Sequence, residues 1–589
     1  MIKALIEIGK VLRERYPMPL VEVPYPTLKG KKEPKVLVVD LVADSNGTLE
    51  ISHIFLADYS PQESFTKYFF RNPSSAQGPA PSLSFKLPPK ITALKQRLGI
   101  LNLIGYKADE NEIAKAIEDK VNELKESGSL GKTNPLLIVL RIDKKWPAEN
   151  EKLTKKFVEN FLESLGQKKY RRYWKKEWVC HGCGQETCVY GGIGDLLKFY
   201  TVDKFGYAPE LDPKKAWKQY ALCAECIFDL ERGRRAIEEF LTHTFYGKKF
   251  WLLPVATEKL EAILDRFRNF KEGGGRTYET SYELLEDRLL YEASQQAGAL
   301  FYHFVFFQQE QKALRIVLHL EEVLPSVLWR YVTAKNEIEQ RFHESIEEAF
   351  PSAEKLFFNF FSSPNLRATQ KKPGFTDKDF FMLVDKVFRE SPVDEDYLIT
   401  RAISRIGSDF LESGENLGIP RQSILETLLS LEFLLEWGVL KRKVASRPGG
   451  LTMEQTSFQE FFEKHGDFFN HPAKRGLVLL GVLTQKFLNY QFRERGSTPF
   501  LKMLKNLRLD QKDVQKLFVG LQNKMNEYGI GHYWPKIREG VSLSLIEAGD
   551  HWPLSPEEIG FYLAVGMSLH KHPVFGDTKT EATEESASS

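Results

Sequence analysis

Five cysteines confined to 47 residues of a 589-residue chain are the feature that most constrains this sequence. They are Cys180, Cys183, Cys188, Cys223 and Cys226, and four of them form two Cys-x-x-Cys pairs. A disulfide scaffold of this size would spread its cysteines along the chain, so the clustering points to a metal instead. Each pair supplies one edge of the thiolate tetrahedron that Zn²⁺ prefers. We therefore predict a zinc site at Cys180, Cys183, Cys223 and Cys226.

Four protein ligands leave no open position for a catalytic water, which indicates a structural rather than a catalytic metal. Three alternatives stay open at this point. The pairs could be unrelated reduced cysteines, or one pair could be redox-active, although neither lies in a thioredoxin-like βαβ context. Cys188 or His181 could also replace one of the four ligands.

Length and composition set the scale of the fold. A chain of 589 residues predicts roughly three to five domains, and 42% apolar residues with 42 Phe can build several cores. The formal charge of +2 excludes a polycation but not a local basic surface. The longest apolar runs, 136–140 and 476–483, are too short for a membrane span, and residues 1–15 lack a secretory signal. We expect a cytoplasmic protein without a membrane partner.

Local patterns predict a multidomain α+β fold. Asn46-Gly47 lies between two β-branched runs and predicts a hairpin over Lys35–Asp58. Apolar periodicity predicts helices over 1–15, 63–70, 109–126, 232–245, 257–269 and 328–350, and strands over 135–142, 300–307 and 314–320. From Thr376 onward the pattern is almost entirely helical.

These patterns divide the chain into six predicted parts. They are an N-terminal α+β domain with β-hairpins (1–165), a basic and aromatic segment with a zinc-binding insertion (166–235), a central α+β region with a hairpin at 300–320 (236–375), a helical connector (376–450), an all-helical C-terminal bundle (451–576) and a disordered tail (577–589).

Two basic stretches stand out. Residues 168–178 read KKYRRYWKKEW, with six cations interleaved with aromatic rings, a combination typical of single-strand binders. A solvated helix face with buried rings is the alternative. The second stretch, 474–539, carries thirteen Lys and Arg against five acids, a net +8 that suits a nucleic-acid backbone or an ordinary soluble bundle.

No recognisable catalytic motif accompanies these stretches. Gly128–Thr133 lacks the spacing of a phosphate loop and runs from helix to strand, the reverse of the required order. His319-Leu-Glu321 is not followed by the Pro-Cys-x-x-Cys of a zinc deaminase, and His-Glu-x-x-His is absent. A zinc-dependent nuclease or deaminase stays as the alternative function, because metal and basic residues occur together.

Several segments together resemble the large subunit of the type I-B CRISPR interference complex (Cascade). The resemblance rests on CHGCGQETCVYGG, on FYTVDKFGYAPELDPKKAWKQYALCAEC with the following DLERG, on ALRIVLHLEEVLPSVL at 313–328, and most strongly on residues 479–529. From the resemblance we expect a helix that contains a glycine to begin at DLERG, residues 229–233.

The resemblance implies a subunit that is not an enzyme. Such subunits contact the 5′ handle of a guide RNA, recognise the protospacer-adjacent motif in target duplex DNA, help to open the duplex into an R-loop and position the displaced strand. A helicase–nuclease is then recruited in trans for antiviral defence, and backbone and small subunits complete the complex. The C-terminal region resembles a small subunit, for which Met453 is a candidate internal start.

The predicted sites follow from these arguments. Residues predicted to contact nucleic-acid backbone are Lys168, Lys169, Arg171, Arg172, Lys175, Lys176, Lys474, Lys486, Arg493, Arg495, Lys502, Lys505 and Arg508. Motif reading is predicted for the loop that holds Arg71, Asn72 and Gln77, since amide side chains can hydrogen-bond base edges.

Overall fold

The computed structural model describes most of the chain. The described residues are 1–17, 35–60, 67–68, 82–85, 91–131, 136–168, 171–197, 199, 209–273, 285–296, 298–310, 313–347, 366–412, 420–441, 457–464, 466 and 468–576. The predicted helix at 63–70, most of the motif-reading loop, Met453 and the tail at 577–589 lie wholly or largely outside them.

The fold is α+β and divides into two compact units. The first comprises Met1–Thr242, Trp251–Lys271 and Phe307–Ile316, and the second comprises His243–Phe250, Glu272–Phe306 and Val317–Ser589. This confirms the predicted fold class, while the finer six-part division stays a prediction. Within the described part of the chain, no helix has the length and apolar character needed to cross a membrane.

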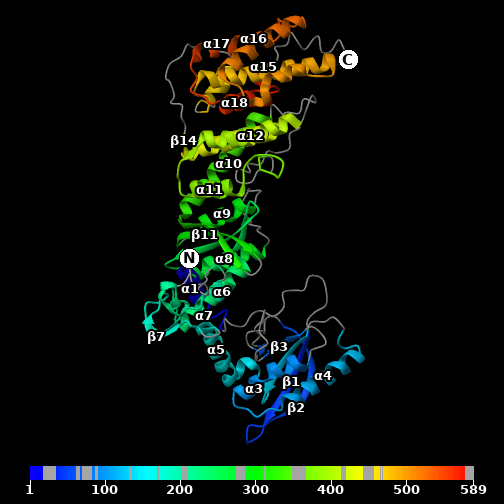
Figure 1. The fold of residues 1–589 in the computed structure, drawn as a ribbon, viewed down its shortest axis with the longest axis vertical. Helices are drawn as coiled ribbons and strands as arrows, with labels where there is room; N and C mark the ends of the chain where they lie inside the picture. The colour runs from blue at the N-terminus through cyan, green and yellow to red at the C-terminus, as the bar shows by residue number, and fades with distance from the viewer. Residues whose placement is uncertain are drawn as a thin grey trace. The chain divides into compact units, whose positions relative to one another are not determined.

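A four-stranded sheet organises the N-terminal part of the first unit (Figure 1). Its order is β2-β1-β4-β3, with β1 antiparallel to β2 and parallel to β4. The strands are β1 (Lys35–Ala43), β2 (Leu49–Asp58), β3 (Ser82–Phe85) and β4 (Leu136–Ile142). The helices that accompany them are α2 (Ile91–Leu98), α3 (Ile100–Leu103) and α4 (Glu110–Glu126). The predicted hairpin, the buried strand and the helix at 109–126 are confirmed.

Alternation along β1 explains how this sheet is buried on both faces. Leu37, Val39 and Leu41 share one core with α2 and α4, whereas Val36 and Val38 pack on the opposite face with Tyr68 and Trp146. Asp109 caps α4 by accepting hydrogen bonds from two backbone N–H groups of its first turn.

The remainder of the first unit carries the cysteines. Its elements are α1 (Ile2–Val11), α5 (Glu151–Gly166), β5 (Gln167–Lys168), β6 (Arg171–Arg172), β7 (Trp174–Val179), β8 (Glu186–Tyr190), α6 (Gly194–Leu197), α7 (Ala224–Ala236) and α8 (Leu260–Glu272). The basic stretch at 168–178 therefore forms short strands where the structure describes it, and its helical alternative is wrong. The predicted helices at 1–15 and 257–269 are confirmed.

A second four-stranded sheet has the order β12-β11-β10-β9. Its strands are β9 (Thr242–Phe245), β10 (Lys248–Ala256), β11 (Ala299–Glu310) and β12 (Ala313–Val323). The two strands predicted at 300–320 are confirmed. The helix predicted over 232–245 is confirmed as far as residue 241, where α7 ends in a π-helical turn at Ile237–Leu241, and is wrong only in its last four residues, because the β-branched and aromatic Thr242–Phe245 join this sheet.

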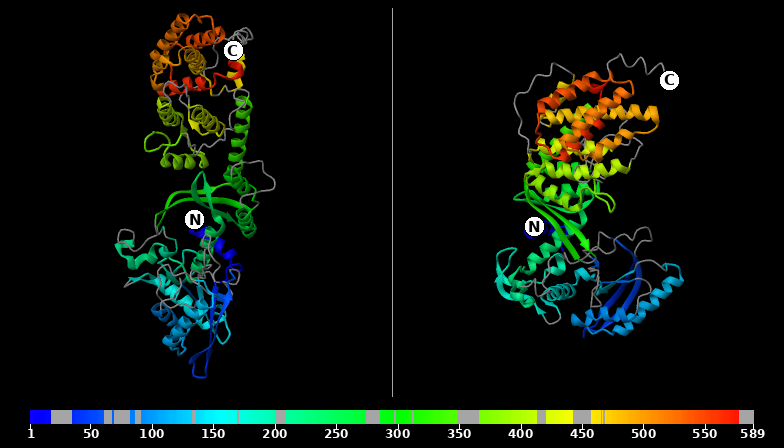
Figure 2. Two further views of the ribbon diagram at one scale, coloured as in Figure 1. Left: turned by 90° about the vertical axis from the view of Figure 1, so that its right-hand side faces the viewer. Right: turned by 45° about the horizontal axis from the view of Figure 1, so that its top comes forward.

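The second unit ends in a series of helices, drawn from green to red in Figures 1 and 2. Its helices are α9 (Leu285–Ser294), α10 (Pro325–Glu347), α11 (Asp377–Phe388), α12 (Glu395–Glu412), α13 (Arg421–Glu436), α14 (Ser457–Lys464), α15 (Pro472–Arg495), α16 (Gln511–Glu527), α17 (Pro535–Ala548) and α18 (Pro556–Ser568). A 3₁₀ segment, η8 (Pro499–Leu507), joins α15 to α16. The prediction of a helical C-terminal part is confirmed, with one addition: a short parallel pair, β13 (Val393–Asp394) with β14 (Leu440–Lys441).

Candidate metal centre and nucleic-acid interface

The two Cys-x-x-Cys pairs meet although 39 residues separate them. The sulfur atoms of Cys180, Cys183, Cys223 and Cys226 all lie within 4.8 Å of one another. The first pair occupies the turn between β7 and β8, and the second begins α7, with Cys223 as the N-cap. The grouping of these four cysteines is thus confirmed.

Backbone geometry prepares the first pair for a cation. The N–H groups of Gly182 and Cys223 donate to Cys180 Sγ at 3.4 and 3.2 Å. Gly184 adopts φ +75°, the left-handed conformation that this turn requires and that glycine adopts without strain. A Cβ at position 182 would lie 2.8 Å from Cys226 Sγ, so only glycine fits there.

The thiol pKa values favour a bound dication. Hydrogen bonding from Cys223, together with backbone N–H groups, lowers the pKa of Cys180 to about 4 despite burial. Burial raises the pKa of Cys226 to about 12, and the hydrogen bond with Cys180, followed by burial, raises that of Cys223 well above its usual range. Cys180 is therefore the readily ionised thiol of these three, and a dication would stabilise the thiolate form of the ligands it binds. Four sulfur donors fit Zn²⁺ in chemistry and number.

Neither alternative ligand belongs to this cluster. His181 Nδ1 accepts a hydrogen bond of 3.0 Å from the backbone N–H of Ala221, which ties the first cysteine turn to the segment before Cys223. Cys188 lies in β8, outside the group of four. The set Cys180, Cys183, Cys223 and Cys226 can hold a metal through protein ligands alone.

Aromatic rings and cations of the basic segment gather beside this cluster. The rings of Trp178 and Trp217 meet edge to face at 4.8 Å, and the Lys175 ammonium lies 5.2 Å from the Trp217 centroid. Lys218 contributes a second cation to Trp217, at 5.7 Å, and also pairs with Glu210.

Trp217 and Lys218 were not among the residues predicted from the sequence. The sequence feature that could have identified them is the run Ala-Trp-Lys at 216–218, between the cysteine pairs, in which an aromatic residue stands next to a cation. Lys175 and Lys176 are exposed as predicted. Lys169 and the side chains of Lys168, Arg171 and Arg172 lie outside the described part of the structure.

Most cations predicted on the C-terminal bundle reach its surface. Arg493, Arg495, Lys502, Lys505 and Arg508 are exposed, and Lys486 is half-buried. They come from the C-terminal half of α15 and from η8 with its C-cap. Lys505 is paired with Asp513 at 2.6 Å, so its charge is partly compensated.

Lys474 is a correction to the predicted set. Its side chain is 1% exposed, its ammonium lies 3.6 Å from Glu395 Oε1, and it sits 4.7 Å from the Tyr562 ring centroid. A lysine enclosed in this way does not present its charge to a phosphate. It serves instead as a buried counter-charge between α12 and α15.

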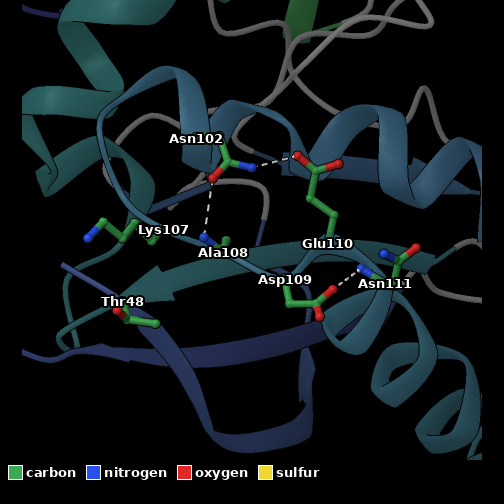
Figure 3. A pocket seen from close by; sticks show the side chains of 7 residues that line it. All are labelled: Thr48, Asn102, Lys107, Ala108, Asp109, Glu110 and Asn111. Atoms are coloured by element: carbon green, nitrogen blue, oxygen red, sulfur yellow. Dashed lines mark hydrogen bonds between the residues drawn. The ribbon is translucent and has the colours of Figure 1, made fainter. Parts of the chain in front are cut away.

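The predicted motif-reading residues Arg71, Asn72 and Gln77 lie outside the described residues. A pocket of about 520 Å³ lies in the first unit, where the tip of the β1–β2 hairpin meets the start of α4 (Figure 3). Asn102 organises it by donating to Glu110 Oε1 at 2.8 Å and accepting from the Ala108 N–H at 3.2 Å. Asn102 is therefore hydrogen-bonded within the pocket wall itself, and these bonds stabilise the segment between α3 and α4.

The fold and the site define a multidomain α+β protein with a four-cysteine cluster in its first unit. Two models of one protein family match it: the central domain of the CRISPR-associated protein TM1802 matches residues 177–323, and its C-terminal domain matches residues 307–581. The chain belongs to the CRISPR-associated protein TM1802 family. No curated protein matches it in a sequence search.

Proposed function

We propose that this chain is the non-catalytic large subunit of an RNA-guided type I-B CRISPR interference complex. Membership of a CRISPR-associated family over residues 177–581 is the observation that carries the proposal. The cysteine cluster supports it, since four protein sulfurs complete the tetrahedron of Zn²⁺ and leave no position for an attacking water. The metal then serves to hold β7, β8 and α7 together.

In this proposal the protein reads a short motif while base pairing reads the sequence, which is the general logic of RNA-guided recognition. The chain contacts the 5′ handle of the guide RNA and recognises the protospacer-adjacent motif in duplex DNA. Exposed cations of α15 and η8 then track the backbone of the target or the displaced strand. Backbone and small subunits are its protein partners in the cytoplasm, and a helicase–nuclease recruited in trans performs cleavage.

A tagged pull-down from the native host tests this proposal. We expect short RNAs that share one repeat-derived 5′ handle, together with several protein partners. Heterogeneous RNA without a common handle, or no RNA at all, from an intact preparation would contradict it. The protein would then have to be assayed for metal-dependent cleavage or deamination.

Motif reading is tested separately. In the assembled complex, the pair Asn72→Ala and Gln77→Ala is expected to lose preference for one motif in a library of target duplexes, because the amides that would pair with base edges are removed. The motif preference of an Asn46→Ala variant, at the β1–β2 hairpin tip, serves as the control. An unaltered preference in the double variant would remove this loop from the proposal.

A further inference from the structure

A row of cations and aromatic rings lies along the outer side of α15. Lys486, Tyr490 and Arg493 follow one another at intervals of four and three residues, so their side chains share one helical stripe. Three rings after α16 face this stripe. We call the following six residues the cation–aromatic stripe: Lys486, Tyr490, Arg493, Tyr528, Tyr533 and Trp534.

The rings of the stripe contact one another edge to face. Tyr490 meets Tyr528 at 6.1 Å and 86° and Tyr533 at 6.2 Å and 87°, and Tyr533 meets Trp534 at 5.6 Å and 79°. All four rings are half-buried, in contrast to Phe487 of the adjacent core, which is fully buried. Edge-to-face packing anchors each ring while part of it stays at the surface.

Cations are interleaved with these rings. The Lys486 ammonium lies 5.7 Å from the Trp534 centroid, and the Arg493 guanidinium lies 5.3 Å from that of Tyr490. Arg495 extends the pattern at 5.8 Å from the Tyr528 ring, and its Nη1 donates to the Tyr528 hydroxyl at 3.1 Å. The acid on the same turns is Glu494, which is exposed, so cations outnumber acids on this end of the helix.

The backbone at Trp534 is an independent observation. This residue has φ +52° and ψ +48°, the left-handed conformation that a tryptophan rarely adopts. It is the N-cap of α17, and a proline at the next position fixes where that helix begins. Such a conformation persists where the surroundings enforce it, and it often marks a functional position. It holds the indole ring beside Lys486.

We infer that the cation–aromatic stripe binds single-stranded nucleic acid, with bases stacked on its rings and phosphates on Lys486 and Arg493. Bases of a duplex are stacked on each other, so ring faces are useful to a single strand and not to a double helix. This separates the stripe from Lys502, Lys505 and Arg508 of the neighbouring η8 region. Among the described residues, the structure records no ring over these three cations, so any nucleic-acid backbone suffices for them. The inference rests on the proposed function and deepens it, since that function supplies the displaced DNA strand or the guide RNA as the source of the single strand.

The test uses the full-length protein and three fluorescent probes: oligothymidine, oligouridine and a duplex, each about twenty nucleotides long. The variant is Tyr490→Leu with Tyr533→Leu, which retains bulk but removes the aromatic faces. Its matched control is Tyr490→Phe with Tyr533→Phe. We expect the leucine pair to bind the single strands about fivefold to 150-fold more weakly per base unstacked, with the phenylalanine pair close to wild type.

Two further readouts distinguish stacking from a structural role. The leucine pair is expected to leave duplex affinity and the salt dependence of single-strand binding unchanged, whereas Arg493→Gln lowers the salt slope by about 0.7 for each phosphate that the variant no longer binds. Equal weakening on duplex and single strand, or no weakening at all, would overturn the inference and leave a protein-docking surface as the explanation. If the leucine pair fails to fold by circular dichroism, Trp534→Leu gives the same decision.

The two single-strand probes identify the source. Preference for oligothymidine points to displaced DNA, and preference for oligouridine points to guide RNA; both support the inference. Its failure is distinguishable from failure of the proposed function. If binding depends on the rings but the pull-down recovers no guide RNA, the stripe binds single strands and the proposed function is wrong. If the pull-down recovers guide RNA but binding does not depend on the rings, only the inference about the stripe is wrong.

Discussion

Arg13 of α1 and Asp229 of α7 form a two-point ion pair across 216 residues of sequence. Arg13 Nε and Nη2 donate to the two carboxylate oxygens of Asp229 at 2.9 and 2.6 Å, and Arg232 Nη1 adds a third hydrogen bond at 2.8 Å. The Asp229 side chain is 1% exposed. Because α7 also carries Cys226, the N-terminal helix braces the helix that presents one cysteine of the cluster.

Removal of this carboxylate is expected to destabilise the first unit strongly. Asp229→Ala leaves Arg232 buried without its counter-charge, a change that typically costs about 3–5 kcal/mol. Urea unfolding followed by circular dichroism should show an earlier first transition. Asp58→Ala is the control, because Asp58 forms an ion pair with Lys35 at an exposed site. Equal midpoints for the two variants would show that Asp229 does not brace α7.

Close packing of α1 on α7 gives a second prediction. A Cβ at position 233 would lie 2.2 Å from the backbone oxygen of Leu5, so Gly233→Ala forces the helices apart. We expect a lower melting temperature and faster proteolysis near residue 12. Gly520→Ala on α16 is the control, since its Cβ would meet Met503 Cε at an ordinary 3.5 Å and gain helix propensity. Melting of both variants at the wild-type temperature would show that α1 and α7 are not in contact at Gly233.

Metal content tests the cysteine cluster. Elemental analysis of the purified protein should find about one zinc per chain, and Cys223→Ser should lose it together with thermal stability. Cys188→Ser removes a thiol from the same hairpin but outside the cluster, so its zinc content should stay at the wild-type level. Two unrelated reduced pairs would instead give zinc-free wild-type protein with five titratable thiols.

Salt dependence tests the C-terminal cations. Replacing Lys502, Lys505 and Arg508 with Gln should weaken duplex DNA binding and lower the slope of log affinity against log salt by about 0.9 for each phosphate no longer neutralised. Lys474→Met should leave that slope unchanged, because Lys474 is enclosed beside Glu395. An unchanged slope in the triple variant, or a reduced one in Lys474→Met, would contradict the assignment.

Two buried histidines predict sensitivity to acid in the second unit. Burial lowers the pKa of His303 and of His570 to about 4, from an unfolded value near 6.5. The folded state therefore binds fewer protons than the unfolded state between these values, so stability is lost as pH falls from about 6.5 to 4. Melting temperatures across this range should fall less steeply for His570→Gln. The same slope in variant and wild type would exclude His570 as a source.

Local signals in the sequence predicted much of the architecture. Asn46-Gly47 predicted the first hairpin. The Cys-x-x-Cys spacing predicted the group of four cysteines whose sulfur atoms lie within 4.8 Å of one another in the structure. Each signal is local, and the meeting of the two cysteine pairs across 39 residues was inferred from the four sulfur ligands that Zn²⁺ prefers. The helix predicted over 109–126 is a similar case, because apolar periodicity is a local pattern.

The predictions that failed depend on distant partners. Lys474 lies in a basic stretch, yet Glu395 and Tyr562 enclose it from two other helices. Asp229–Gly233 suggested the start of a helix, but α7 begins at Ala224 and Gly233 is a point of close approach to Leu5. The strand at Thr242–Phe245 follows from pairing in a sheet. The cation–aromatic stripe could not be predicted from the sequence either, because its rings meet only where the loop after α16 packs against α15.

The central claim is that this chain is required, without cleaving DNA itself, for a guide-loaded complex to open its target. The direct measurement is permanganate footprinting of a matched duplex with purified complex, with and without the chain. We predict reactive thymines in the displaced strand only when the chain is present, and intact DNA strands in both cases before the helicase–nuclease is added. Opening that is equal without the chain, or strand cleavage by the chain alone, would contradict the account.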